Sequence, residues 1–110
     1  MDVNATWSEI LAILAQPMTS ENADRLEELA YALDGWLARG GYAPGTWPVG
    51  TLGYYRHACA YGESVGMSDG ECVTYAAWFV AEWATDIDTD TDHTREVVRF
   101  RRIMSVATVV

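Results

Sequence analysis

Lysine is absent from this 110-residue sequence, and the few bases that it has leave the chain strongly acidic. Seven arginines stand against sixteen Asp and Glu, so the formal net charge is −9 at pH 7 although only 21% of the residues are charged. An acidic surface repels phosphate groups within a Debye length, which argues against nucleic acid and anionic membranes as partners. A basic or neutral partner is favoured.

Cysteine and long apolar runs are also scarce. Cys59 and Cys72 are the two cysteines, and no run approaches the roughly 18 apolar residues that a membrane span needs. No base precedes Arg25, so the basic start of a secretory signal is missing. These absences predict a cytoplasmic protein with two reduced thiols rather than a disulfide, and no membrane partner.

The chain is, by contrast, rich in apolar and aromatic residues. Half of it is hydrophobic, with five Trp and six Tyr, which is enough for a well-filled core. A length of 110 residues suits one ordinary domain. We therefore expect residues 1–110 to form a single domain, and the patterns below predict an all-α fold of about five helices with the fourth helix central.

The first helix is predicted from a capping pair. Thr6 and Glu9 have the spacing of a capping box, in which a hydroxyl and a returning carboxylate satisfy amides at the helix start. Pro17 ends the helix. Its expected inner face consists of Trp7, Ile10, Leu11 and Leu14.

The second helix is predicted from near Ser20 to Gly40, where a glycine can take the left-handed capping conformation. Glu21 and Arg25 are expected to pair across one turn, and Gly35 predicts a bend or a close packing contact. The expected buried stripe consists of Leu26, Leu29, Leu33 and Leu37.

Two further helices follow. The third is predicted over roughly Thr51 to Glu63, ended by glycines at positions 62 and 66. The fourth begins with Ser68 and Glu71 at capping-box spacing and continues as ECVTYAAWFVAEWAT, which is apolar nearly all round. A helix that is apolar on all sides belongs in the middle of a core.

The fifth helix is predicted to carry two opposed faces. At 100° per residue an apolar arc of about 120° holds Val97, Phe100, Ile103, Met104 and Ala107. A basic arc of about 60° holds Arg95, Arg99 and Arg102. We expect helix to about Met104, with residues 105–110 left open between continued helix and an extended tail.

Four aspartates at every second position, from Asp86 to Asp92, are reminiscent of a calcium loop. Such a loop needs Gly at its sixth position and Glu at its twelfth, where this chain has Thr91 and Val97. We therefore predict no specific calcium site. The run is interpreted as ending the fourth helix and beginning the fifth, since acids favour a helix start.

Metal and catalytic chemistry have few candidate residues. His57, Cys59, Cys72 and His93 are the right types for zinc, but none form the short ligand pairs of structural zinc sites. A Cys–His or carboxylate pair could act in catalysis, but no motif fixes its geometry. The sequence predicts no metal, no cofactor and no catalysis.

The loop GGYAPGTWPVG, residues 40–50, combines glycines and prolines with the rings of Tyr42 and Trp47. Large rings favour burial, so we expect the loop to fold onto the helices, although Tyr and Trp are also common interface anchors. The longer stretch LDGWLARGGYAPGTW, Leu33 to Trp47, resembles a segment of small uncharacterised proteins of actinobacterial phages and their hosts, with Tyr42 where that segment has Phe. The resemblance implies no activity.

Together these patterns predict a small acidic protein-interaction module: an adaptor, an inhibitor or an assembly partner. The candidate interface is the basic arc with Tyr42 and Trp47, and an acidic body with one basic helix is self-complementary, which favours a homodimer. Two alternatives stay open. One is a DNA-mimic inhibitor of a nucleic-acid-binding protein, and the other is a small enzyme or ligand-binding domain that uses His57, Cys59 and nearby acids.

Overall fold

The part of the chain that the structure describes contains five α-helices, joined by loops, and no strand. The computed structural model describes residues 1–83 and 92–106. The prediction of an all-α fold of about five helices is confirmed. The calcium-loop positions Asp86 to Thr91, and Ala107, lie outside the described residues. In chain order the helices are α1 (Val3–Leu14), α2 (Ser20–Ala38), α3 (Thr51–Ser64), α4 (Asp69–Trp83) and α5 (His93–Val106).

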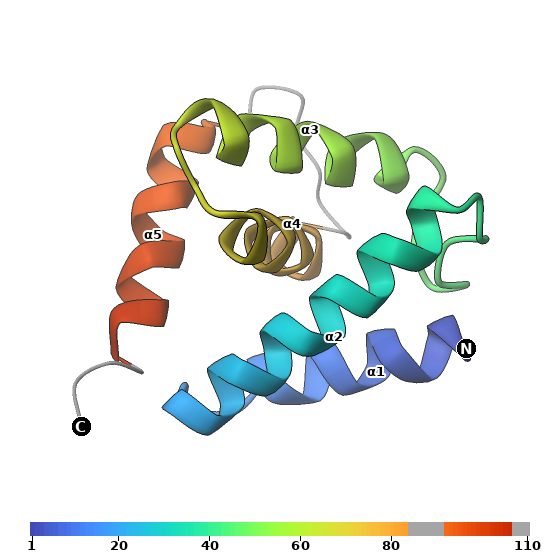
Figure 1. Ribbon diagram of the computed structural model, residues 1–110, viewed down its shortest axis with the longest axis horizontal. Helices are drawn as coiled ribbons and strands as arrows, with labels where there is room; N and C mark the ends of the chain where they lie inside the picture. The colour runs from blue at the N-terminus through green and yellow to red at the C-terminus, as the bar shows by residue number, and fades with distance from the viewer. Residues whose placement is uncertain (84–91, 107–110) are drawn as a thin grey trace.

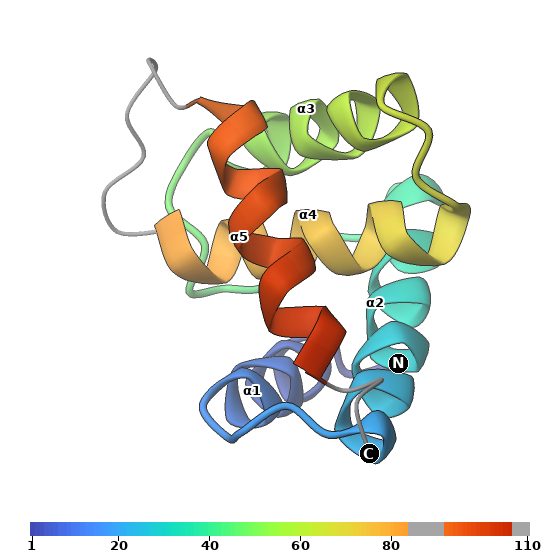
Figure 2. The same ribbon diagram turned by 90° about the vertical axis from the view of Figure 1, so that its left-hand side faces the viewer.

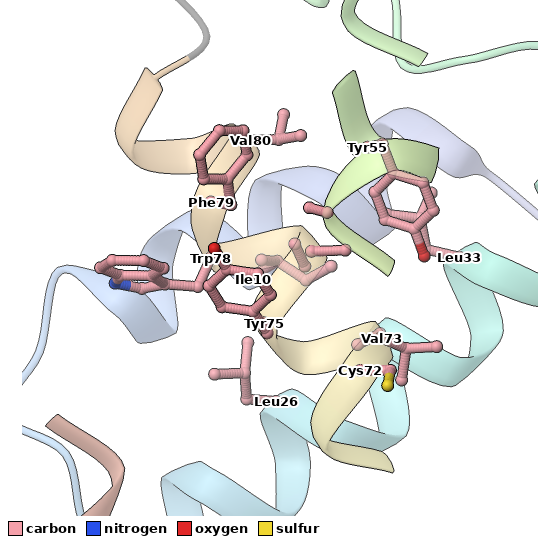
Figure 3. Packing of buried hydrophobic residues seen from close by; sticks show 14 of the residues in the cluster. Ile10, Leu26, Leu33, Tyr55, Cys72, Val73, Tyr75, Trp78, Phe79 and Val80 are labelled. Atoms are coloured by element: carbon pink, nitrogen blue, oxygen red, sulfur yellow. The ribbon is translucent and has the colours of Figure 1, made fainter. Parts of the chain in front are cut away.

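Helix α4 packs against each of the other four helices. Figure 1 views α4 nearly end-on, with α3 on one side of it and α1 and α2 on the other. Figure 2 shows α5 crossing over α4. Residues 72–80 of α4 are all buried, which accounts for the apolar sequence on every side of this helix. Figure 3 shows this core, which includes Ile10, Leu26, Tyr75, Trp78, Phe79 and Val80.

The start of α1 differs from the prediction. Its N-cap is Asp2, whose carboxylate accepts a hydrogen bond from the Ala5 N–H at 3.1 Å. Thr6 lies one turn inside the helix, where its hydroxyl donates to the Asp2 carbonyl. Asp and Thr both cap helices well, and adding one turn puts buried Val3 on the inner face, so the sequence pattern fits either start.

The inner face of α1 differs from the predicted set at one position. Trp7 and Ile10 are buried and Leu14 is partly buried, as expected. Leu11, however, is 40% exposed, and Ile13 is buried instead. These two residues lie on opposite edges of the apolar stripe, so helical periodicity could not decide which of them faces the core.

Helix α2 follows the predicted bounds. Thr19 caps it by accepting from the Asn22 N–H at 3.1 Å, and Gly40 beyond its end has a φ of +84°. The four stripe residues are all buried, namely Leu26, Leu29, Leu33 and Leu37. This stripe turns α2 toward α1 and α4.

An expected ion pair and an expected packing contact inside α2 are not found. Arg25 forms ion pairs with Glu9 of α1 at 2.6 Å and with Glu28 at 2.9 Å, rather than with Glu21. The guanidinium reaches across to α1 because that helix packs beside α2. Among the described residues Gly35 makes no close packing contact, since the nearest atom to a Cβ there would be in the Arg39 guanidinium, at 3.8 Å. The alternative expectation, a bend at Gly35, stays a prediction.

The loop between α2 and α3 buries one of its two rings. Trp47 is 9% exposed and packs edge-on against Trp7, with ring centroids 5.2 Å apart, and beside Tyr55. Tyr42 is 65% exposed, and its ring lies in a T-shaped arrangement with that of Trp36, which also donates a hydrogen bond to the Tyr42 carbonyl. The expectation that both rings fold inward therefore holds for Trp47 and fails for Tyr42.

The turn from α3 to α4 is set by glycine and serine. Gly66 has a φ of +84°, which favours glycine and ends the helix, and the Ser68 hydroxyl accepts from the Glu71 N–H at 3.2 Å as predicted. Gly62, expected to help end the helix, lies inside α3 and is buried. A Cβ there would lie 3.1 Å from the Cys72 sulfur, so Gly62 allows α3 and α4 to approach closely.

Candidate functional site

Helix α5 is anchored to the core by the predicted apolar face. Val97 and Phe100 are 6% and 2% exposed, and Met104 packs partly buried at the edge of the same cluster. The Phe100 ring lies 5.4 Å from that of Tyr75 and 5.6 Å from that of Trp78. The anchoring fixes which side of α5 faces solvent.

The solvent face of α5 carries arginines on either side of a valine. Arg95 and Arg102 are exposed, and Val98 between them is 48% exposed. Spacings of three and four residues place them on one side of the helix, opposite Phe100. We call Arg95, Val98 and Arg102 the basic stripe. Neither of its arginines forms an ion pair with any residue in 1–83 or 92–106.

Arg99, the third arginine of the predicted interface, is engaged within its own chain. Its guanidinium pairs with Glu96 at 2.9 Å and approaches Glu82 at 3.8 Å. It also lies over the Trp78 ring, 5.5 Å from the centroid, where the cation is attracted to the ring face. Because Glu96 is only 4% exposed, Arg99 neutralises a buried carboxylate. Arg99 thus ties α5 to α4.

A groove of about 460 Å³ runs beside the basic stripe, between α2, α4 and α5. Its apolar lining includes Met104, which is partly buried, and Phe100, which is almost fully buried. Three carboxylates line it, those of Asp24, Glu27 and Glu71. We call this feature the acidic groove. Its one lining cation, Arg101, lies 3.8 Å from Glu71, so the carboxylates of α2 outnumber the positive charge.

Glu27 reaches the acidic groove because α4 has a glycine at its second residue. A Cβ at Gly70 would collide with the Glu27 carboxylate, so the absence of a side chain there lets Glu27 lie against the first turn of α4. The N-terminal end of a helix attracts negative charge, which favours this placement. The position of the Glu27 carboxylate in the groove therefore depends on the lack of a side chain at Gly70.

The Cys59 side chain lines two smaller pockets of about 400 and 210 Å³, which share Asp34, Cys59 and Glu63. The Tyr55 hydroxyl donates to Asp34 at 2.8 Å. Burial, followed by the negative charge of Asp34, raises the pKa of the Cys59 thiol to about 12. The thiol therefore stays protonated at neutral pH and lacks the character of a nucleophile.

His57, the base considered for Cys59 in the enzyme alternative, belongs to a different cluster. Its ring centroid lies 5.2 Å from that of His93, whose ring stacks on Tyr61 at 5.1 Å and packs beside Phe79 at 4.8 Å. The structure thus joins His57 to His93, from α3 and α5, and not to Cys59. The spacing of His57 and Tyr61, four residues apart on α3, is a weak sequence signal for this cluster.

The predicted interface residues are not brought together. Figure 1 shows the loop between α2 and α3, which carries Tyr42 and Trp47, at the opposite end of the molecule from α5. Trp47 is buried in the core, whereas Tyr42 is available at the surface. Of the predicted arc of Arg95, Arg99 and Arg102, the first and last belong to the basic stripe, and Val98 was not predicted to be part of it. The acidic groove was not predicted from the sequence, because its lining comes from three helices that are distant in the chain.

In the ranges 1–83 and 92–106, no three His, Cys, Asp or Glu side chains are grouped so that they could hold a metal ion. In the same ranges, no helix has the length and apolar content required to cross a membrane.

The fold and its surfaces define an acidic all-α domain with a basic last helix. A scan against protein-family models, a search of curated proteins and a search of solved structures each find no match. The resemblance of Leu33–Trp47 to phage and host proteins therefore stays a prediction.

Proposed function

We propose that the protein acts by binding another protein and that the basic stripe of α5 is its contact surface. One observation carries the proposal: Arg95 and Arg102 are exposed on either side of an exposed Val98 and form no ion pair with any described residue. Arginines beside an apolar side chain favour a complementary acidic surface with an apolar centre.

The charge of the protein favours a protein partner over a nucleic acid. A stripe with two exposed arginines on a chain of net charge −9 gives a small electrostatic footprint for phosphates. Two charges are, by contrast, enough to set the register of a protein contact. Cys59 and Cys72 are both free thiols, which agrees with action in the cytoplasm.

The enzyme alternative has less support. Its nucleophile would be Cys59, whose pKa is raised to about 12, and the imidazole of His57 is held against His93 instead. A nucleophilic thiol needs a lowered pKa or an adjacent base. A binding protein without catalysis is therefore the function that we favour.

The proposal is tested by reversing the stripe in the full chain. We expect the Arg95→Glu, Arg102→Glu variant to lose the partner that co-purifies with the tagged wild type from its native host. The matched control is Arg39→Glu, Arg56→Glu, which makes the same change in net charge at two other exposed arginines. Equal recovery of the partner with both variants would contradict the proposal.

A further inference from the structure

We infer that the partner of the basic stripe is a second copy of this chain, with the stripe of each copy seated in the acidic groove of the other. The inference rests on the proposed function and names its partner. It also names the receiving surface, which lies between α2, α4 and α5.

The two surfaces are complementary in charge and in polarity. The basic stripe presents Val98 between two arginines, whereas the groove presents the partly buried Ala23 and Met104 together with acidic side chains. Seating the stripe would place the valine against the apolar lining and the arginines near the carboxylates. Such pairing fixes the register of two copies, and the apolar contact supplies affinity.

The acidic groove retains an excess of negative charge in the single chain. Arg101 approaches Glu71, but at 3.8 Å, and both side chains are about half exposed, at 50% and 48%. The carboxylates of Asp24 and Glu27 also line the groove, and both residues are exposed. An incoming arginine would therefore meet two acids of α2 that have no positive group of their own in the groove lining.

Both surfaces border the same helix, which permits a reciprocal contact. At 100° per residue, the groove residues Arg101 and Ser105 lie next to the stripe residues Val98 and Arg102 on the surface of α5. A two-fold axis near this boundary would bring the stripe of the first copy to the groove of the second, and the reverse. Closed two-fold dimers are the commonest assemblies, since each copy uses the same patch.

The test is a charge exchange between stripe and groove, measured by sedimentation velocity on the full chain. The stripe variant is Arg95→Glu, Arg102→Glu, and the groove variant is Asp24→Arg, Glu27→Arg. Each variant alone faces like charge across the contact, so we expect its dimer dissociation constant to rise at least about tenfold. Mixing the two variants restores opposite charges at both contacts, so the mixture should form heterodimers.

Val98→Glu offers a second route, because the exposed valine can change without disturbing the core. It too should raise the dissociation constant at least about tenfold. Arg39→Glu, Arg56→Glu is again the control and should leave the dimer unchanged. Cooperative thermal unfolding of each variant, measured at a low protein concentration where the wild type is also dissociated, would show that it is folded.

Each outcome decides the inference. The inference is overturned if the wild type stays monomeric up to roughly 500 µM. This concentration is well above the dissociation constant expected of even a small specific interface. Charge reversals that leave the dimer intact, or a mixture that fails to recover it, overturn the pairing of stripe with groove. If the wild type is monomeric while the stripe variant still loses its co-purified partner, the second-copy inference fails and the proposed function stands.

Discussion

Tyr75 and His93 join the central part of α4 to the first residue of α5, with 2.8 Å between the phenol oxygen and Nδ1 of the imidazole. Burial is the main cause that raises the pKa of Tyr75, so its hydroxyl keeps the proton and can donate it to a neutral imidazole. When His93 is protonated, its Nδ1 carries a hydrogen and can no longer accept a hydrogen bond from the Tyr75 hydroxyl. The start of α5 is therefore sensitive to the charge on one histidine.

Stability should fall as the pH drops below the ordinary histidine pKa of about 6.5. Burial first, and then nearby His57, lower the pKa of His93 in the folded chain, while Glu96 and Asp92 act in the opposite direction. The unfolded chain then binds the proton first. The stabilising contribution is complete above the unfolded pKa and is lost as pH falls toward the lowered folded value.

Urea denaturation of the wild type and of His93→Gln at pH 7.5 and 5.5 measures this effect. We expect the wild type to lose more of its free energy of unfolding than the variant over this interval. Equal losses would show that His93 is not the group responsible.

The Cys59 thiol should react slowly. With a pKa of about 12, the thiolate fraction at pH 7 is about a thousandfold below that of an ordinary cysteine. We expect alkylation by iodoacetamide at pH 7, followed by peptide mass spectrometry, to be at least ~100-fold slower at Cys59 in the folded chain than in urea. Rapid modification of the folded protein would revive the enzyme alternative.

Trp47 should tolerate phenylalanine far better than alanine. Its indole nitrogen is buried, and no hydrogen-bond acceptor for it is present among the described residues, which costs about 1–3 kcal/mol. Trp47→Phe removes this donor and keeps a ring beside Trp7, so it should change the free energy of unfolding by less than about 1 kcal/mol. Trp47→Ala should lower it by about 3–5 kcal/mol. Similar losses for both variants in urea denaturation would contradict this account.

Opposite faces of α5 should differ sharply in their effect on stability. Phe100→Ala removes a ring that is 2% exposed and should lower the free energy of unfolding by about 3–5 kcal/mol. Val98→Ala, on the exposed face, should stay within about 0.5 kcal/mol of the wild type. Denaturation in urea at low protein concentration compares the two. A large loss from Val98→Ala would place that residue in the core.

Much of the fold could be predicted because its signals are local. Ser68 and the leucine stripe of α2 act within a few residues of their own position, and they marked the helices correctly. The misplaced start of α1 has a local cause as well. Asp2 and Thr6 are both good caps, and either start leaves the same apolar face inward.

The candidate site could be predicted only in part. The basic stripe follows from the spacing of Arg95 and Arg102 along one helix. The engagement of Arg99 with Trp78 and Glu82 depends on how α5 crosses α4, which no pattern in α5 encodes. The acidic groove likewise requires α2 and α5 to lie beside the start of α4, a relationship fixed by tertiary packing.

Hydrogen–deuterium exchange of the unmodified protein at two concentrations tests the central claim, that α5 meets the acidic groove of a second copy, most directly. The account predicts that dilution from roughly 200 µM to 2 µM, across the dissociation constant expected of a small interface, speeds exchange in α5 and around Asp24 and Glu27 of α2. Exchange in α3, which contributes to neither surface, should stay constant. Exchange in α5 that is independent of concentration, or that changes equally in α3, would contradict the account.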